Sequence, residues 1–476
     1  MKEKKTVTMR TLALSVIGTA ILSGGLVVGY EQITQQGTSF IKAAAPESDE
    51  LAKVHALYTL LQTDYYKKVD SSKLVDGALK GMTSALDDPY STYLEKSDAA
   101  EFTQALSDSF EGIGATLSLV DNVPQIAQAP IKGTPAEKSG LKAGDQILAV
   151  DDTPTTGQTL NEIVSKIRGK KGTTVTLSLQ RGQDPFKVTL TRDKIPLHSV
   201  TSELDEAHPT IGKIAITTFS EKTATELKEA IIALRSKGAK SFVIDLRQNP
   251  GGLLDQVSQM ASMFLKDGQT IVQLESRNGA VEKTVAAKAL DGGFKVTEPT
   301  AVLVDSGSAS ASEIFAGAVN ESANVPLIGT KTFGKGTVQT VSQYQDGSEV
   351  KLTIKKWLTP KKEWIHEKGL QPTYAVDYPA FVTAPPLPTD QILQQGISST
   401  AVKSLNLYLA GLGYQTSGEV FDETTKAAVL DFQLKHQLTP TGTVESQTAK
   451  QLTQAALQEL KTNDQMYQKA VELLTK

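Results

Sequence analysis

The sequence predicts an α+β protein of several domains, because its hydrophobic pattern changes along a chain of 476 residues, a length that suits about three domains. Short strand-like runs fill residues 110–195. Strands and helices alternate over residues 198–380, which is typical of an α/β layer. A proline-rich run at 384–388, expected to be a stiff linker, precedes residues 391–476, whose pattern is mostly helical.

The first residues predict a membrane anchor over 1–31. Lysines and an arginine precede the uncharged stretch from Thr11 to Tyr30, which is long enough to cross a hydrocarbon core of roughly 30 Å. The cationic flank favours the cytoplasm, so the rest of the chain is expected outside it. A signal peptide cleaved near Ala43-Ala44-Ala45 and a buried core helix are the alternatives.

The remaining elements follow from periodicity. Helical spacing of apolar residues starts at Asp49 and defines an N-terminal helical region at 47–107, with further helices at 73–86 and 97–106. In the β-rich part we expect a helix at 158–168 and strands at 114–119, 146–150, 174–179 and 187–191. In the alternating part we expect strands at 211–217, 241–246 and 301–304 and helices at 224–237, 254–264 and 314–319.

Composition excludes several classes of function. With 49 Lys+Arg against 53 Asp+Glu, the net charge of −4 offers no basic field, so nucleic acid is not an expected partner. The chain has no cysteine, which excludes disulfides, thiolate metal sites and a cysteine nucleophile. The five histidines are scattered, so no metal cluster is expected either.

Two glycine-rich loops mark the β-rich part as a binding module. Residues 110–115 and 140–150 each lead into a strand. Converging N–H groups of such a loop can hold a carboxylate, and an exposed strand can accept an extended peptide, although an ordinary hairpin is the simpler alternative. With Thr134-Pro135-Ala136 and the later helix, this order resembles a PDZ domain, expected at 108–196. The resemblance implies that protein C-termini are bound by the loop Gly112, Ile113, Gly114 and Ala115.

Arg168 ends the helix that is expected to flank the peptide groove. Its charge suits a helix C-terminus, which is the simpler role. The alternative is a bond to the neighbouring domain that reports peptide binding.

The serine-rich turn 306–313 joins an apolar strand to a helix. Small residues there leave a side-chain oxygen exposed beside free N–H groups that can stabilise an oxyanion, although a serine-rich N-cap is the alternative. No histidine lies in a comparable block, so the base must be another residue. Lys335, between two glycines, can act if burial lowers its pKa, and Gln339 can hold its amine. A solvated hairpin lysine is the simpler interpretation.

A third block, 245–254, ends a buried strand, and its paired glycines can expose an N–H as an oxyanion donor, although a plain βα turn would look the same. Together with 87–93, the three blocks resemble the C-terminal processing peptidases over about residues 50–380. The resemblance implies an α/β serine protease core at 197–383 that needs no metal or cofactor. In it, Ser310 is the nucleophile, Lys335 the general base and Gln339 its support. The implied oxyanion donors are the N–H of Ala311 and that of Gly251 or Gly252, of which we prefer Gly252.

Residue 250 departs from the family pattern, because Pro250 stands where many relatives carry glycine or serine. It could stiffen the oxyanion loop. It also removes an N–H that the reaction does not require.

The residues from 402 to 448 suit three short helices and resemble a peptidoglycan-binding domain, expected at 391–455 and followed by a C-terminal helix at 456–476. A helical bundle for oligomer contacts is the alternative. We therefore expect a serine endopeptidase anchored by a single pass in the cell membrane, facing the wall of a Gram-positive bacterium. Its expected partners are protein substrates with free C-termini, peptidoglycan and a second copy of the chain. Removal of 391–476 is expected to leave cleavage of a soluble protein unchanged.

Two other classes of function fit parts of the sequence. A catalytically silent PDZ and wall-binding adaptor would not need the intact set Ser310, Lys335 and Gln339. A peptidoglycan hydrolase is suggested by the C-terminal part alone, and neither a histidine-rich zinc motif nor a cysteine nucleophile supports it.

Overall fold

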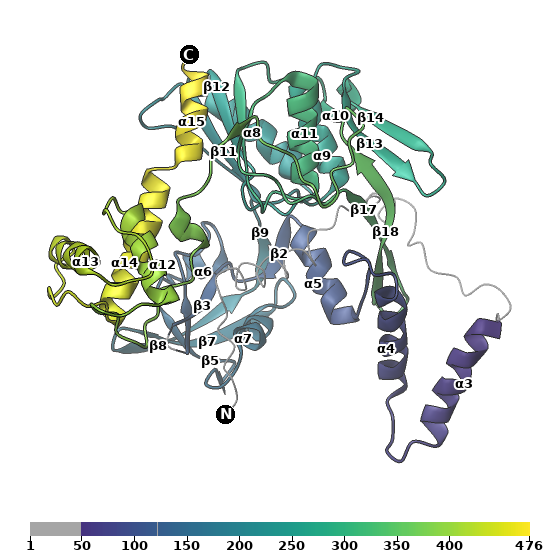
Figure 1. Ribbon diagram of the computed structural model, residues 1–476. Coiled ribbons are helices and arrows are strands. Elements are labelled where there is room, and N and C mark those ends of the chain that lie inside the picture. Colours follow the sequence, from purple (N-terminus) through teal and green to yellow (C-terminus); the bar gives the residue numbers. More distant parts are fainter. Residues whose placement is uncertain (1–48, 121) are drawn as a thin grey trace. The chain divides into compact units, whose positions relative to one another are not determined.

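A computed structural model of the chain describes residues 49–120 and 122–476. They divide into two compact units, one of residues 100–199 and one that joins the residues before 100 to Val200–Lys476 (Figure 1). The anchor predicted at 1–31 lies outside the described residues. Within them, no helix is both long and apolar enough to span a membrane.

The unit of residues 100–199 is rich in strands. Its main sheet has the order β3-β4-β5-β7-β8 with β6 beside β5, while β2 pairs with β9. Helix α7 begins at a capping box of Thr159 and Glu162, and its Ile163 joins the core. The elements are β2 (Ser109–Gly112), β3 (Leu117–Val120), β4 (Val123–Ile126), α6 (Pro135–Lys138), β5 (Gln146–Val150), β6 (Thr153–Pro154), α7 (Leu160–Ile167), β7 (Thr174–Arg181), β8 (Asp184–Thr191) and β9 (Asp193–Pro196).

The other unit is built on a sheet of order β10-β11-β12-β15-β16-β19. Only the β10–β11 pair is antiparallel. The elements of this layer are β10 (Val200–Leu204), β11 (Ile211–Ile216), α8 (Thr223–Ser236), β12 (Ser241–Asp245), α9 (Leu254–Phe264), β15 (Thr300–Val304), α11 (Ala311–Ala323), β16 (Leu327–Gly329), β19 (Tyr374–Ala375) and α15 (Gln465–Leu474).

Both faces of this sheet are covered, because alternate residues of a strand point to opposite sides. Ile244 and Val302 pack in one core with apolar residues of α8, α9 and α11. Their neighbours Val243 and Leu303 pack in a second core with Met466 of α15. The helix α15 therefore covers one face of this sheet.

A second sheet flanks this layer, with the order β1-β18-β13-β14 and β17 also paired with β18. Its first strand comes from the start of the described chain and pairs Thr92 with Lys351. The elements here are α3 (Asp49–Thr63), α4 (Ser71–Ser84), β1 (Thr92–Leu94), β13 (Thr270–Ser276), β14 (Val281–Val285), α10 (Lys288–Asp291), β17 (Thr337–Gln343) and β18 (Glu349–Leu358). Helix α5 (Lys96–Leu106) follows β1 and continues into the unit of residues 100–199.

The C-terminal helices form a separate core. They are η1 (Ala380–Thr383), α12 (Thr400–Gly411), α13 (Glu423–Lys435) and α14 (Ser446–Thr462). Phe381, Ala384 and Leu387 are buried in that core, so the proline-rich run at 384–388, expected to be a stiff linker, is packed against the helices.

Most predicted elements are present, with four main differences. The strand expected at 187–191 begins three residues earlier, at Asp184. The strand expected from Gly114 starts at Leu117, because Gly114 has φ +83° and cannot continue a strand. The helix expected at 314–319 begins at Ala311. The helix expected at 456–476 is two helices, because α14 ends at Thr462 and Asp464 caps α15.

Candidate active site

The serine-rich turn follows β15 and leads directly into α11. Ser310 precedes the helix with φ +57° and ψ −112°, a conformation that side-chain-bearing residues rarely adopt. Its N–H donates to Glu313 Oε2 at 2.9 Å, so the first turn of α11 holds the strained residue in place. Backbone strain of this kind costs about 1–3 kcal/mol and persists where surrounding contacts impose it.

The three serines of the motif have different surroundings. Ser308 Oγ donates to the carbonyl of Leu246 at 2.8 Å, and Ser312 Oγ donates to the carbonyl of Asn249 at 2.8 Å. By contrast, Ser310 Oγ is buried with no hydrogen-bond partner among the described residues. We expected an exposed hydroxyl at this turn, and the structure corrects this, because neighbouring loops cover Ser310 completely.

Glu313 connects the serine turn to the loop that carries Lys335. Its Oε2 accepts the N–H of both Ser310 and Lys335, the latter at 2.8 Å, and its Oε1 accepts from Thr332 and Gly334. The two backbone positions thus share one carboxylate oxygen. Burial raises the pKa of Glu313, against the effect of these four donors. We assigned Glu313 no role from sequence, although its place three residues after a helix-capping serine was a usable signal.

Lys335 is buried next to aromatic rings. Its Nζ lies 4.5 Å from the centre of the Tyr90 ring, and its carbonyl accepts from Trp357 Nε1 at 2.7 Å. Burial, reinforced by the charge of Lys351, lowers the pKa of Lys335 to about 7, while Asp88 acts in the opposite direction. A neutral amine is therefore accessible near neutral pH, which a solvated hairpin lysine would not provide.

Gln339 is buried on β17 and fixed through its amide nitrogen. Its Nε2 donates to Thr337 and Thr353 Oγ1, both at 3.0 Å. Its Oε1 has no partner among the described residues and is free to accept a hydrogen bond. The fixed amide thus presents an acceptor, the group that an amine or ammonium requires.

The two candidate oxyanion glycines differ in their N–H groups. The N–H of Gly251 donates to Asn249 Oδ1 at 2.9 Å, so it is already engaged. The N–H groups of Gly252 and Ala311 have no acceptor in the described part of the chain. This difference supplies the reason, missing from the sequence, to prefer Gly252.

Gly251 also has no room for a side chain. A Cβ built there would lie 2.9 Å from Ser310 Cβ and 2.8 Å from the carbonyl oxygen of Ala309, and its φ is +102°. The loop of 248–252 therefore lies directly against the serine turn. The structure thus brings together the serine, lysine and glycine blocks.

The predicted peptide-binding loop belongs to the unit of residues 100–199. Gly112 ends β2, the carbonyl of Ile113 accepts the N–H of Ala136 at 2.8 Å, and Gly114 leaves no room for a Cβ beside Thr134. The next strand, β3, is at an edge of its sheet and contacts α7. An edge strand after a glycine loop is the arrangement that strand addition requires.

Arg168 follows the last residue of α7 with an extended backbone, and its N–H donates to the carbonyl of Val164. Its guanidinium lies 5.0 Å from the centre of the Phe110 ring. Arg168 therefore also packs on an aromatic ring of its own unit, in addition to the two roles considered from sequence.

Family models match four parts of the chain. Residues 210–376 match peptidase family S41, and residues 126–181 match a PDZ domain. Residues 398–452 match a peptidoglycan binding domain, and residues 20–98 match the N-terminal domain of the activating protease CtpB.

Curated relatives are similar over nearly the whole chain. The carboxy-terminal processing protease CtpA of Bacillus subtilis (strain 168) is 44% identical over 466 residues, 97% of each chain. CtpB of the same organism is 37% identical over 92% of this chain and 93% of its own. Among solved structures, the photosystem II D1 C-terminal processing protease is 27% identical and matches 81% of this chain and 96% of its own, with a TM-score of 0.42.

Proposed function

Since the chain belongs to the carboxy-terminal processing proteases of peptidase family S41, and is therefore a serine protease, we propose that Ser310 is its nucleophile and Lys335 its general base. One observation carries this proposal. Of the three buried serines, only Ser310 combines a positive φ with a hydroxyl that no described residue binds, whereas Ser308 and Ser312 are used in backbone contacts.

The reaction follows from these groups. Lys335, as a neutral amine, takes the proton of Ser310 Oγ while the oxygen attacks the carbonyl carbon of the scissile peptide bond. The N–H groups of Ala311 and Gly252 donate to the resulting oxyanion. The ammonium of Lys335 then gives its proton to the leaving amine. A water molecule, deprotonated by Lys335, finally hydrolyses the acyl ester and frees Ser310.

Gln339 has a supporting role in this proposal. Because its amide nitrogen is held by Thr337 and Thr353, its free Oε1 has a fixed direction. It can accept a hydrogen bond from the lysine amine in both protonation states. We propose that it holds the amine in the orientation needed to reach Ser310.

Substrates are proposed to be proteins with free C-termini, delivered by the unit at 108–196. The loop from Gly112 to Ala115 would bind the terminal carboxylate, and the edge strand β3 would pair with the preceding residues. The match to a PDZ domain supports this assignment.

The protease is proposed to act outside the cytoplasm, at the wall of a Gram-positive bacterium. The match to a peptidoglycan binding domain over 398–452 supports a tether to the wall. The cationic flank and uncharged stretch at 1–31 support a single-pass anchor. Homodimer contacts through the helices of 47–107 remain part of the proposal.

The test compares two alanine variants of one turn. Ser310→Ala should lower the cleavage rate of an unfolded protein such as casein by roughly a factor of 10⁴ or more. Ser306→Ala is the matched control, because Ser306 is exposed in the same turn, and it should cleave normally. Near-normal cleavage by Ser310→Ala would refute the assignment and would return the silent adaptor to consideration.

A further inference from the structure

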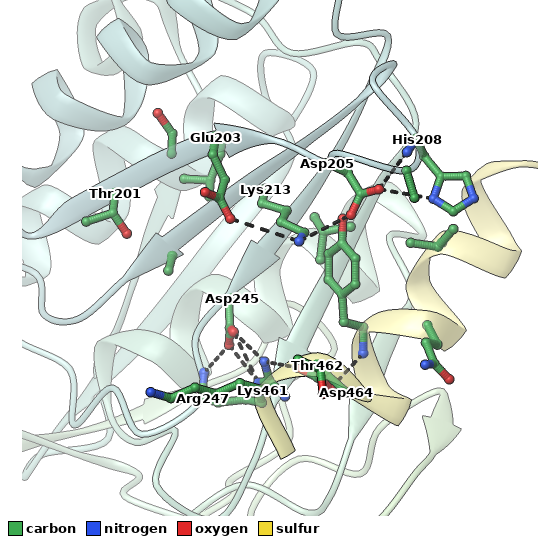
Figure 2. Close-up of a pocket in the computed structure, with 18 residues that line it drawn as sticks. Thr201, Glu203, Asp205, His208, Lys213, Asp245, Arg247, Lys461, Thr462 and Asp464 are labelled. Atoms are coloured by element: carbon green, nitrogen blue, oxygen red, sulfur yellow. Dashed lines mark hydrogen bonds and ion pairs between the residues drawn. The ribbon is translucent and has the colours of Figure 1, made fainter. Parts of the chain in front are cut away.

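A cavity of about 630 Å³ lies between the protease sheet and the C-terminal helices, and the predicted catalytic residues do not line it (Figure 2). One wall comes from β10, β11 and the turn after β12. The other wall comes from the end of α14 and from α15. The cavity thus lies where the protease layer meets the end of α14 and the helix α15.

Two polar networks attach α15 across this cavity. At one side, Asp205 accepts a hydrogen bond from Tyr467 Oη at 2.9 Å and pairs with Lys213 at 3.2 Å. At the other side, Asp464 Oδ2 lies 2.6 Å from Arg247 Nη2. Figure 2 shows Lys213 beside Asp205 and Arg247 beside Asp464. Tyr467 links the two networks, because its N–H donates to Asp464 and its hydroxyl to Asp205.

The Arg247 network is made of largely covered charges. The Arg247 side chain is 16% exposed and that of Asp464 is 22% exposed. Arg247 also binds both oxygens of Asp245, which ends β12. Asp464 uses its other oxygen to accept the N–H of Tyr467, so the same carboxylate caps α15 and pairs with the arginine.

Arg247 is the second residue after β12, at the start of the loop that carries the oxyanion glycines. Two residues later, Asn249 holds the N–H of Gly251 through its side chain and the N–H of Ala309 through its carbonyl. Gly251 in turn lies against Ser310. A shift of Arg247 therefore reaches the serine turn through one short, tightly bonded loop.

A hydrogen bond from Tyr378 also connects these loops to the chain that follows the catalytic motifs. Tyr378 Oη donates to Asp305 Oδ2 at 2.8 Å. Asp305 also accepts from the backbone and side chain of Gln248 and from the N–H of Gly307. Both the serine turn and the oxyanion loop are thus braced by residues that follow the catalytic motifs.

We propose that Asp464 acts through Arg247 as a positioning residue for the oxyanion loop. The catalytic rate of the protease would then depend on α15. The proposal rests on the assignment of Gly252 and Ala311 as oxyanion donors. Removing one such donor lowers kcat by roughly 10²–10³-fold in serine proteases, and a misplacement of about 1 Å can cost 10²-fold. Loss of the Asp464 carboxylate should therefore lower kcat and leave KM, which reflects substrate binding, almost unchanged.

The experiment measures kcat and KM of the full chain with a fluorogenic peptide. Asp464→Asn keeps a helix-capping side chain but removes the charge. It should lower kcat on the order of tenfold with KM within twofold, and Asp464→Glu should restore most of the loss. Tyr467→Phe is the matched control, because it removes the other attachment of the same helix, and it should stay within about twofold of the parent.

Two results would overturn the proposal. One is an unchanged kcat in Asp464→Asn. The other is an equal loss in Tyr467→Phe, which would show that only helix docking matters. If Asp464→Asn does not fold, Arg247→Lys provides the same test, because lysine keeps the charge but cannot bind two carboxylates in one plane. Failure here leaves the dyad intact, since Ser310→Ala tests it separately.

Discussion

Ser310 carries two features that a packed interior normally excludes, a positive φ and a buried hydroxyl without a partner. The strain is worth about 1–3 kcal/mol, and an unsatisfied buried polar group costs about as much. Neither feature improves packing. If Ser310 is the nucleophile, as proposed, both features cost stability at a position that serves activity.

The Ser310→Ala variant is therefore expected to be inactive and more stable than the parent. Removing the unsatisfied hydroxyl should raise the free energy of unfolding by about 1 kcal/mol, as measured by urea denaturation. Ser312→Ala should do the opposite, because it removes the hydrogen bond to the carbonyl of Asn249. A destabilised Ser310→Ala protein would mean that its hydroxyl has a structural partner after all.

Lys335 gives the activity a pH dependence with a definite sign. Burial lowers its pKa to about 7, and in the proposed mechanism the neutral amine is the active form, so kcat/KM should rise with pH through about 7 and then level off. Lys351→Met removes a like charge, so the rise should move to higher pH. Asp88→Asn removes an opposing charge, so the rise should move to lower pH.

The pH profile of kcat/KM checks this prediction, with Lys356→Met as the control. Lys356 lies on the same strand as Lys351 but is largely exposed, so its loss should leave the profile in place. Shifts of the same sign in the Lys351 and Asp88 variants would contradict the electrostatic account.

Sequence motifs nominated the candidate site residues but did not predict their surroundings. The order of the three blocks pointed to Ser310, Lys335 and Gln339 through a family resemblance. The burial of Ser310 and the contact of Glu313 with the Lys335 loop were not predictable, because both depend on loops that come together only in the folded sheet. The choice of Gly252 over Gly251 likewise needed the contact with Asn249.

At the scale of elements, strand β3 and the loop before it should decide peptide binding. Peptides that end in a free carboxylate should bind the inactive Ser310→Ala protein at least about tenfold more tightly than their C-terminal amides. Gly114→Ala should abolish the difference, because a Cβ there would lie 2.4 Å from Thr134 Cβ. Fluorescence polarisation measures both affinities, and Gly157→Ala, with open space around it, is the control for a glycine with φ above zero.

Equal affinity for acid and amide peptides would remove the carboxylate loop from the proposal. The strand would then have to bind through its edge alone.

Element positions were largely predictable because hydrophobic periodicity is a local signal. Helix α9 and strand β5 have the expected bounds. The partner of α15 was not predictable. Its apolar residues meet Val243 and Leu303, which lie far away in the sequence, and nothing local marks that pairing.

At the scale of the whole molecule, the C-terminal segment divides into two parts with different tasks. Helices α12, α13 and α14 share one core with the run around Leu387, whereas α15 joins the protease layer. Removal of 391–476 would uncover the apolar face around Val243. We therefore no longer expect that deletion to be harmless, as the sequence alone had suggested.

Deleting only 464–476 should separate the two tasks. The shortened protein should still sediment with purified peptidoglycan, because the core of α12 to α14 is intact. Its melting temperature and its cleavage of a soluble protein should both fall, since α15 no longer covers the sheet or holds Arg247. Deletion of 475–476 leaves α15 whole and is the control. Full cleavage by the 464–476 deletion would show that the helix is dispensable.

The long stretch of chain between α15 and the strands that it covers also has a consequence during synthesis. Strand β12 ends at Asp245, and α15 begins at Gln465. At about 5–20 residues per second, the ribosome makes the intervening chain in roughly 10–40 s. Throughout that interval the face of the sheet around Val243 lacks its cover and Arg247 lacks Asp464. Under the proposal above, the oxyanion loop therefore gains its full support only after α15 has been made.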